Sequence, residues 1–211
     1  MRPATATPST EKGRQTLERI VMAASSLFYA KGVTATGLAE IVRESGTGKS
    51  QLYHYFSDKR DVVHAVIRRH VECSVRPQRS QLEAMATSQD LRAWANAAVA
   101  AHETGGPARC PLGALTVEVA DTDPGLRAAL SEGFTEWAGL LAAGLERLQR
   151  TGHVRTDRSA ADLAEVLLCA YEGGVLLSVA HNSTLPLRRA LDSAVDAMTA
   201  SHSPTQPEDL P

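Results

Sequence analysis

The 211-residue chain has little of several features that mark particular classes of protein. Aromatic residues make up only 4%, and the three cysteines, Cys73, Cys110 and Cys169, are too few and too scattered for a disulfide framework. No uninterrupted apolar run approaches the roughly 20 residues of a membrane-spanning helix, and the first residues lack the apolar segment of a signal peptide. We therefore expect a cytoplasmic protein with reduced thiols and no membrane partner.

A basic surplus is also missing from the chain as a whole, whose formal net charge is −2. Such a surplus is the usual footprint of a nucleic-acid-binding protein. The charge is unevenly distributed, however, because residues 1–76 contain 12 Lys and Arg against 7 Asp and Glu, whereas residues 77–211 contain 10 against 17. The asymmetry indicates that the N-terminal third meets an anionic partner, although chance unevenness would explain it equally well.

Hydrophobic residues recur at helical spacing through most of the chain, and no segment shows the alternation of a half-buried strand. The first helix is expected over residues 11–31. The two ends, residues 1–10 and 201–211, are rich in Pro, Ser and Thr and are expected to be disordered tails. The pattern predicts an all-α fold with about nine helices.

Capping residues and helix breakers predict where the helices of the first half begin and end. Thr36 is expected to cap a short second helix, and a third helix should begin near Thr47 or Gly48. Ser57 is expected to cap a fourth helix that Pro77 breaks or kinks.

The second half shows the same signals with longer helices. Asp123-Pro124 is typical of a helix start, and Ser159 with Asp162 resembles a capping box that opens a helix over about 160–181. A last helix is expected over about 185–199.

The string from Ser45 to Ser50, Ser-Gly-Thr-Gly-Lys-Ser, resembles a phosphate-binding P-loop but does not satisfy its pattern. The first glycine of that pattern is replaced by Arg43, and the preceding residues form an amphipathic helix where a P-loop requires a strand. Nucleotide hydrolysis is therefore not expected.

The same residues fit a helix-turn-helix, in which a glycine turn at 44–47 separates two short helices. Leu52 and Phe56 have the spacing to face inward. Four polar side chains would then face outward and could contact phosphates or base edges, with the glutamine suited to adenine: Lys49, Gln51, Tyr53 and His54. A plain helical hairpin with a polar outer face has the same periodicity.

The segment from about residue 14 to 67 resembles the TetR family of bacterial one-component transcriptional repressors. The resemblance rests on Thr-Gly-Leu-Ala-Glu-Ile at 36–41, Lys-Ser-Gln-Leu-Tyr-His-Tyr-Phe at 49–56 and Ser-Asp-Lys at 57–59. It implies contacts with DNA bases or phosphates from eight residues: Thr36, Thr47, Gly48, Lys49, Gln51, Tyr53, His54 and Lys59. Many relatives carry serine where this chain has Gly48, so the capping hydroxyl of the recognition helix is missing, and Thr47 is the candidate to supply it.

Residues of about 108–195 resemble the LmrA/YxaF-type branch of that family through Cys-Pro-Leu-Gly at 110–113 and Tyr-Glu-Gly-Gly at 171–174. The resemblance implies a helix-turn-helix DNA-binding domain over 11–57 and a ligand-binding and dimerisation domain over 58–200. It further implies a homodimer formed by the last two helices, double-stranded operator DNA as partner, and a small, largely apolar effector that releases the DNA. Members of this branch commonly govern efflux or detoxification genes.

Scarce bulky side chains on otherwise aliphatic helices are the candidates for effector contacts, although each could equally be ordinary core: Trp94, His102, Phe134, Trp137 and Tyr171. Gly173 and Gly174 lie inside a helix, where each costs up to about 1 kcal/mol relative to alanine. They leave room either for a closely packed helix, which we favour, or for a ligand.

Other chemistry has weak support in the sequence. His70 and Cys73 have metal-ligand spacing without a second pair nearby, and no catalytic motif is present, so we expect no metal site, no cofactor and no enzyme. Two alternatives stay open at this stage: an all-α small-molecule-binding protein that does not bind DNA, and an enzyme that uses Cys110 as a thiolate.

Overall fold

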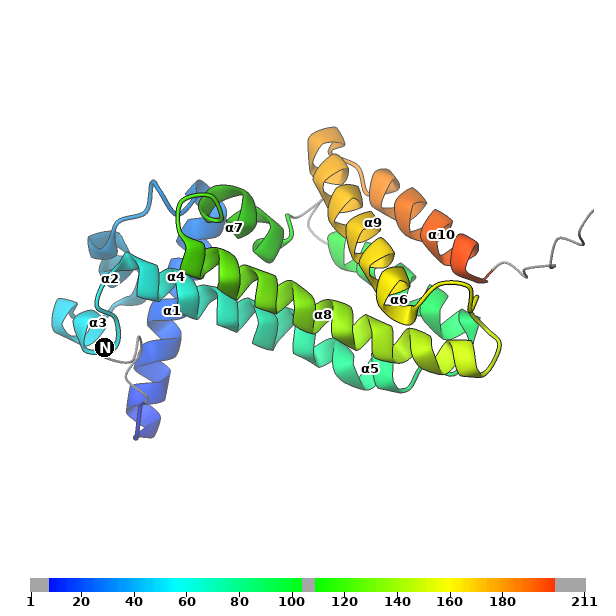
Figure 1. Cartoon of the computed structure of the whole chain (residues 1–211). Coiled ribbons are helices and arrows are strands. Elements are labelled where there is room, and N and C mark those ends of the chain that lie inside the picture. Colours follow the sequence, from blue (N-terminus) through cyan, green and yellow to red (C-terminus); the bar gives the residue numbers. More distant parts are fainter. Residues whose placement is uncertain (1–7, 104–108, 200–211) are drawn as a thin grey trace, which may run out of the picture. The chain divides into compact units, whose positions relative to one another are not determined.

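The computed structural model describes residues 8–103 and 109–199, which form helices joined by short connections and contain no strand (Figure 1). The predicted all-α class with about nine helices is confirmed. Most of the two tails expected to be disordered lie outside the described residues.

Packing divides the chain into two compact units, residues 1–77 with 110–137 and residues 78–109 with 138–211. The first unit contains α1 (Glu11–Lys31), α2 (Leu38–Ser45), α3 (Lys49–Tyr55), α4 (Lys59–His70), α7 (Pro111–Val119) and the start of α8 (Pro124–Arg150). The second unit contains α5 (Arg79–Glu83), α6 (Ser88–Glu103), the rest of α8, α9 (Ala160–His181) and α10 (Leu185–Thr199). The boundary expected between residues 57 and 58 divides the chain by function, into a DNA-binding domain and a ligand-binding domain, and not by packing. It stays a prediction.

The first unit is built around α1, which contacts α2, α3 and α4. Ile20, Ala24 and Phe28 follow one another at four-residue intervals on α1 and are all buried. The helix occupies the residues that its periodicity predicted, and Thr10 caps it by accepting a hydrogen bond from the Gly13 amide at 3.1 Å. The three-helix arrangement α1–α2–α3 is therefore the helix-turn-helix fold that the sequence predicted.

Two of the predicted caps are wrong. Thr36 does not cap α2, because its hydroxyl donates to the Gly32 carbonyl at 2.7 Å, and Gly37 occupies the N-cap position. Ser57 does not cap α4, because the neighbouring Asp58 accepts the Asp61 amide at 3.0 Å. In both cases the true cap lies one residue beyond the predicted one.

The predicted interruption at Pro77 is present as a 3-10 turn, but the regular α-helix already ends at His70. After α4 the chain widens into a π-helical segment, η1 (Val71–Val75), and then tightens into a 3-10 turn, η2 (Arg76–Gln78). Proline has no amide hydrogen to continue the i to i−4 ladder, so the hydrogen bonding changes in the turns beside it.

In the second unit α10 packs against both α9 and α6, and Figure 1 shows α9 and α10 side by side. The predicted start of α9 is confirmed, because the Ser159 hydroxyl accepts the Asp162 amide at 3.0 Å. A Cβ added at Gly174 would lie 2.7 Å from the Leu187 Cα, so this glycine permits the close approach of α10. The packing interpretation of Gly174 is therefore correct.

One helix of the described residues, α9, is long and apolar enough to cross a membrane by length and composition alone. The expectation from uninterrupted apolar runs missed it, because Glu165 and Glu172 divide its sequence. The core helix of a globular protein passes the same test, and α9 buries one side of its surface against α10.

Candidate nucleic-acid interface

The turn between α2 and α3 begins at Gly46, which has a left-handed backbone with φ 60° and ψ 28°. Its amide donates to the Arg43 carbonyl at 3.3 Å, and the Thr47 amide donates to the Val42 carbonyl at 3.3 Å. Glycine adopts this conformation without the steric cost of a side chain, so it fixes the angle at which the chain enters α3.

Gly48 is the N-cap of α3 and has no side chain to offer the first turn. The amide oxygen of Gln51 accepts the Gly48 backbone N–H at 2.8 Å, which is one half of a capping box. The expectation that Thr47 supplies the cap is wrong, because its buried hydroxyl pairs with the Ser45 hydroxyl at 2.8 Å.

The two faces of α3 differ as predicted. Leu52 and Phe56 have no exposed surface, and the buried Tyr55 donates its hydroxyl to the Gly13 carbonyl of α1 at 3.2 Å. The opposite face exposes four side chains of the predicted DNA-contacting set: Lys49, Gln51, Tyr53 and His54. These core contacts fix the orientation of α3, so the exposed polar face is a stable feature of the first unit.

Lys49 and Tyr53 lie one turn apart on this exposed face. The Lys49 ammonium is 5.8 Å from the centre of the Tyr53 ring, and 48% of Tyr53 is exposed. A cation over an aromatic ring at this distance is a weak attractive contact. The pair therefore presents a positive charge and a phenol hydroxyl together.

Thr36 and Lys59 hold the connection between α1 and α2. Thr36 is buried, with its hydroxyl on Gly32 as described above, and the Lys59 ammonium donates to the carbonyls of Val33 at 2.8 Å and Thr36 at 3.1 Å. Contact of either residue with a DNA phosphate stays a prediction, and the structure gives both a role within the fold.

The same connection is held from α7. A carboxylate oxygen of Glu118 accepts the Thr34 amide at 2.7 Å. Sequence reasoning missed these roles of Lys59 and Glu118, because the carbonyl and amide groups they meet are 26 and 84 residues away along the chain.

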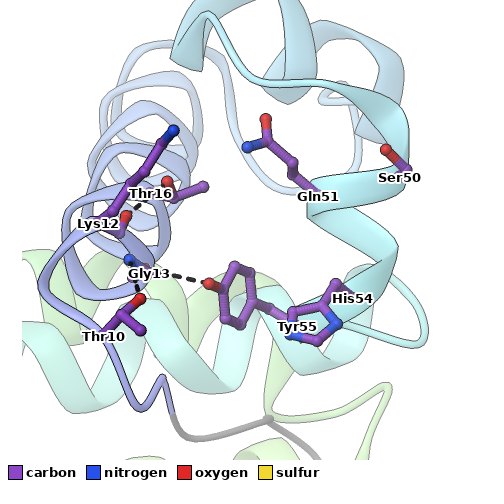
Figure 2. A pocket seen from close by; sticks show the side chains of 8 residues that line it. All are labelled: Thr10, Lys12, Gly13, Thr16, Ser50, Gln51, His54 and Tyr55. Carbon is purple, nitrogen blue, oxygen red and sulfur yellow. Dashed lines mark hydrogen bonds between the residues drawn. The ribbon is translucent and has the colours of Figure 1, made fainter.

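A cleft of about 330 Å³ lies between the first turns of α1 and the exposed side of α3 (Figure 2). It is lined by Thr10, Lys12, Gly13, Thr16, Ser50, Gln51, His54 and Tyr55. The lining holds one lysine, a histidine, an amide and hydroxyl groups, and it includes no carboxylate. This composition suits an anionic or acceptor-rich partner.

Two of the predicted effector-contacting residues, His102 and Tyr171, meet in the second unit. Their rings pack edge to face with centres 5.6 Å apart, and His102 Nε2 lies 3.5 Å from the Tyr171 hydroxyl. The other ring nitrogen of His102 is 2.9 Å from the Ala98 carbonyl. Trp94, in the same unit, is buried and donates its indole N–H to the Gln78 side chain at 3.0 Å.

The remaining two, Phe134 and Trp137, belong to the first unit, where Trp137 is buried and Phe134 is partly exposed. The five residues are therefore divided between the two units. Their contact with an effector stays a prediction.

An apolar strip remains exposed on α9. Leu176 is 70% exposed and Leu177 is 51% exposed, and Val166 and Val179 also face solvent. A Cβ added at Gly173 would meet no atom within 4 Å. Exposed apolar strips of this kind on a helix are typical of protein interfaces.

Comparison with known proteins places both halves of the chain in one family. Residues 20–66 match the model of bacterial regulatory proteins of the tetR family, and residues 82–193 match the LmrA/YxaF-like C-terminal domain of transcriptional regulators. The resemblance inferred from the sequence motifs is confirmed.

Two relatives and one solved structure illustrate the match. The HTH-type transcriptional regulator LmrA of Bacillus subtilis is 27% identical over 81% of this chain and 89% of its own length. An uncharacterized HTH-type regulator in the lacX 3′ region of Lactococcus lactis is 28% identical over 78% of this chain and 83% of its own length. Reduced E. coli NemR shares the fold with a TM-score of 0.81 and 23% identity, over 89% of this chain and 99% of that one. The chain thus belongs to the TetR family of DNA-binding transcriptional regulators, with a C-terminal domain of the LmrA/YxaF-like type.

Proposed function

We propose that the protein is a cytoplasmic, homodimeric repressor that binds a near-palindromic operator and leaves it when a small apolar or aromatic effector binds. The observation that carries the proposal is α3, which exposes Lys49, Gln51, Tyr53 and His54 above a buried base of Leu52 and Phe56. A helix supported in this way can enter the major groove with its polar side chains against bases and phosphates.

The uneven charge supports the same orientation toward DNA. The surplus of Lys and Arg lies in residues 1–76, which contain the helix-turn-helix, whereas the rest of the chain is acidic. Because the basic residues lie mainly in the part with the helix-turn-helix, the attraction to DNA phosphates is concentrated on that part of the molecule.

The dimer would form through α9 and α10. The exposed strip of Leu176, Leu177, Val166 and Val179 gives α9 an apolar surface that its own chain leaves uncovered, and the open space at Gly173 lets a partner helix approach closely. A twofold symmetric pairing of this strip would bury the same residues in both subunits and place one α3 in each half of a palindromic site.

The effector would contact the second half of the chain, with Trp94, His102, Phe134, Trp137 and Tyr171 as the first residues to probe. The His102–Tyr171 pair supports this, because it brings an imidazole and a phenol hydroxyl together, and binding sites for largely apolar ligands contain a few such convergent polar groups. Release would follow if the effector binds better to the conformer whose recognition helices are wrongly spaced. Efflux or detoxification genes are the targets that the LmrA/YxaF-like domain suggests.

Gel-shift titration with duplexes from the DNA next to the gene tests DNA binding by α3. We expect Lys49→Ala and Tyr53→Ala each to weaken binding about tenfold or more, since each deletes contacts worth about 1–3 kcal/mol. Arg127→Ala is the matched control, because Arg127 is an exposed cation on α8 and its loss removes the same charge. Parental affinity in both α3 variants would refute the assignment of the recognition helix.

A further inference from the structure

The side chain of Gln51 is anchored at one end only. Its amide oxygen accepts the Gly48 backbone N–H at 2.8 Å, which fixes the oxygen at the start of α3. Figure 2 shows the amide nitrogen turned toward the cleft, on the side of α1. Within the described part of the chain, no hydrogen bond from this nitrogen is found, so its two hydrogens are available to a partner.

The anchor follows from the residue at the N-cap. Gly48 has no hydroxyl, and the hydroxyl of Thr47 is paired with Ser45 inside the fold. In the first turn of α3 the Gln51 oxygen is therefore the side-chain acceptor of the Gly48 N–H, as in the reciprocal half of a capping box.

We propose that Gln51 reads the operator as a hydrogen-bond donor, and that the base it meets is guanine. The inference rests on the proposed DNA-binding function and adds a base preference to it. A glutamine that recognises adenine accepts from N6 with its oxygen while it donates to N7 with its nitrogen. Because the oxygen is drawn back to the Gly48 N–H at the start of α3, the nitrogen is the end of the amide that faces the cleft and can meet a base.

Guanine suits a donor because its major-groove edge carries two acceptors, O6 and N7. Adenine presents one acceptor, N7, beside the N6 amino donor, which would face the NH2 group of Gln51 without a partner. Thymine presents one acceptor, O4, beside its methyl group, and cytosine presents only a donor at N4, so guanine alone offers two acceptors to the NH2 group. The cap at Gly48 thus changes the preference expected of this glutamine from adenine to guanine.

Selection of binding sites from duplexes with randomised inverted half-sites tests the inference. The position read by Gln51 is the one whose base preference disappears in Gln51→Met, which keeps the length of the side chain without its polar atoms. We expect the parent protein to select guanine there and to bind the guanine duplex about tenfold more tightly than the adenine duplex. An inosine–cytosine pair at that position should bind as guanine–cytosine does, because inosine keeps O6 and N7.

The variant Gln51→Glu tests the two roles of this side chain separately, because it keeps the acceptor for the helix cap and removes the donor to the base. Its carboxylate can accept the Gly48 N–H as before but has no hydrogen to donate, so thermal stability should be kept while the preference for guanine over adenine is lost.

Three results of this selection would decide against the inference or the function. The proposal that Gln51 donates to guanine would be overturned if adenine is selected at the Gln51 position. It would also be overturned if Gln51→Met lowers the affinity for all sequences equally. Neither result would contradict DNA binding itself. Failure of the parent protein to enrich any sequence would instead refute the proposed function.

Discussion

His70, at the end of α4, is a titratable residue inside the first unit. Its Nε2 lies 3.3 Å from the hydroxyl of Ser25 on α1. Burial, together with the smaller effect of the positive charge on the adjacent Arg69, lowers the pKa of His70 to about 4. The folded protein therefore keeps this imidazole neutral over a pH range in which the unfolded chain protonates it.

This difference predicts a loss of stability in mild acid. The unfolded state binds the extra proton once the pH falls below about 6.5, whereas the folded state does so only near pH 4, so the free energy of unfolding falls across that window as pH is lowered. We expect a contribution of about 1–2 kcal/mol after allowance for solvent screening. Urea unfolding at pH 7 and pH 5 should show a smaller acid loss in His70→Gln than in the parent. An equal loss in both would mean that other groups carry the pH dependence.

Single residues also show what a local pattern can predict. The exposure of Tyr53 and the burial of Leu52 followed from helical spacing alone, because α3 needs one face against the core. The role of Lys59 could not be predicted in this way, since its ammonium meets the carbonyls of Val33 and Thr36, which tertiary folding brings to it. The Gln51 cap was visible in principle, because a Gln three residues after an N-cap is half of a capping box.

At the scale of the elements, the caps of α8 and α9 were predicted correctly, whereas those of α2 and α4 were not. Asp123 precedes Pro124 and accepts the amides of Gly125 at 2.8 Å and Leu126 at 3.0 Å, as the sequence suggested. Before α4, two cap-competent residues are adjacent, and Asp58 is used instead of Ser57. A choice between neighbouring caps depends on the angle of the preceding chain, which the local sequence does not encode.

The contact between α9 and α10 predicts that Gly174 cannot be replaced by alanine without loss of stability. Gly174→Ala would force a Cβ to within 2.7 Å of the Leu187 Cα, which is backbone, so the helices must separate, at a cost of about 1–3 kcal/mol. Gly139→Ala on α8 is the matched control, because its Cβ meets nothing within 4 Å, it lies outside the proposed interface, and alanine favours the helix. Thermal unfolding should show a lower midpoint for Gly174→Ala than for Gly139→Ala. The reverse order would refute the close packing of α10 at Gly174.

At the scale of the whole molecule, the distribution of charge predicted where the helix-turn-helix lies, but it did not predict how the chain divides into compact units. The basic N-terminal third identified the part that contains the helix-turn-helix. The compact unit around it also includes residues 110–137, which return from the second half of the sequence. A segment that packs back onto an earlier part of the chain has no periodic signal of this packing in its own sequence. A domain boundary placed at one point of the sequence therefore cannot predict such a unit.

The proposed dimer predicts that one exposed leucine controls the oligomeric state. Leu176→Asp places a charge on the apolar strip of α9 in both subunits, and the loss of about 1.5–3 kcal/mol of leucine burial from each should weaken the dimer about 100-fold or more. Val117→Asp is the control, because Val117 is 89% exposed on α7, outside the proposed interface. Sedimentation velocity should detect monomers for Leu176→Asp and dimers for the parent and the control. A dimeric Leu176→Asp variant would place the interface elsewhere.

The salt dependence of operator binding tests the central claim most directly, because it depends on both α3 and the dimer. Fluorescence anisotropy of a labelled operator duplex should give a linear fall of log affinity with log salt, with a slope of about −0.9 for each phosphate neutralised. Because a dimer carries two copies of Lys49, Lys49→Ala should make that slope shallower by about 2, while Arg127→Ala leaves it unchanged. A slope that is the same in Lys49→Ala as in the parent, or no binding of the parent at low salt, would contradict the account.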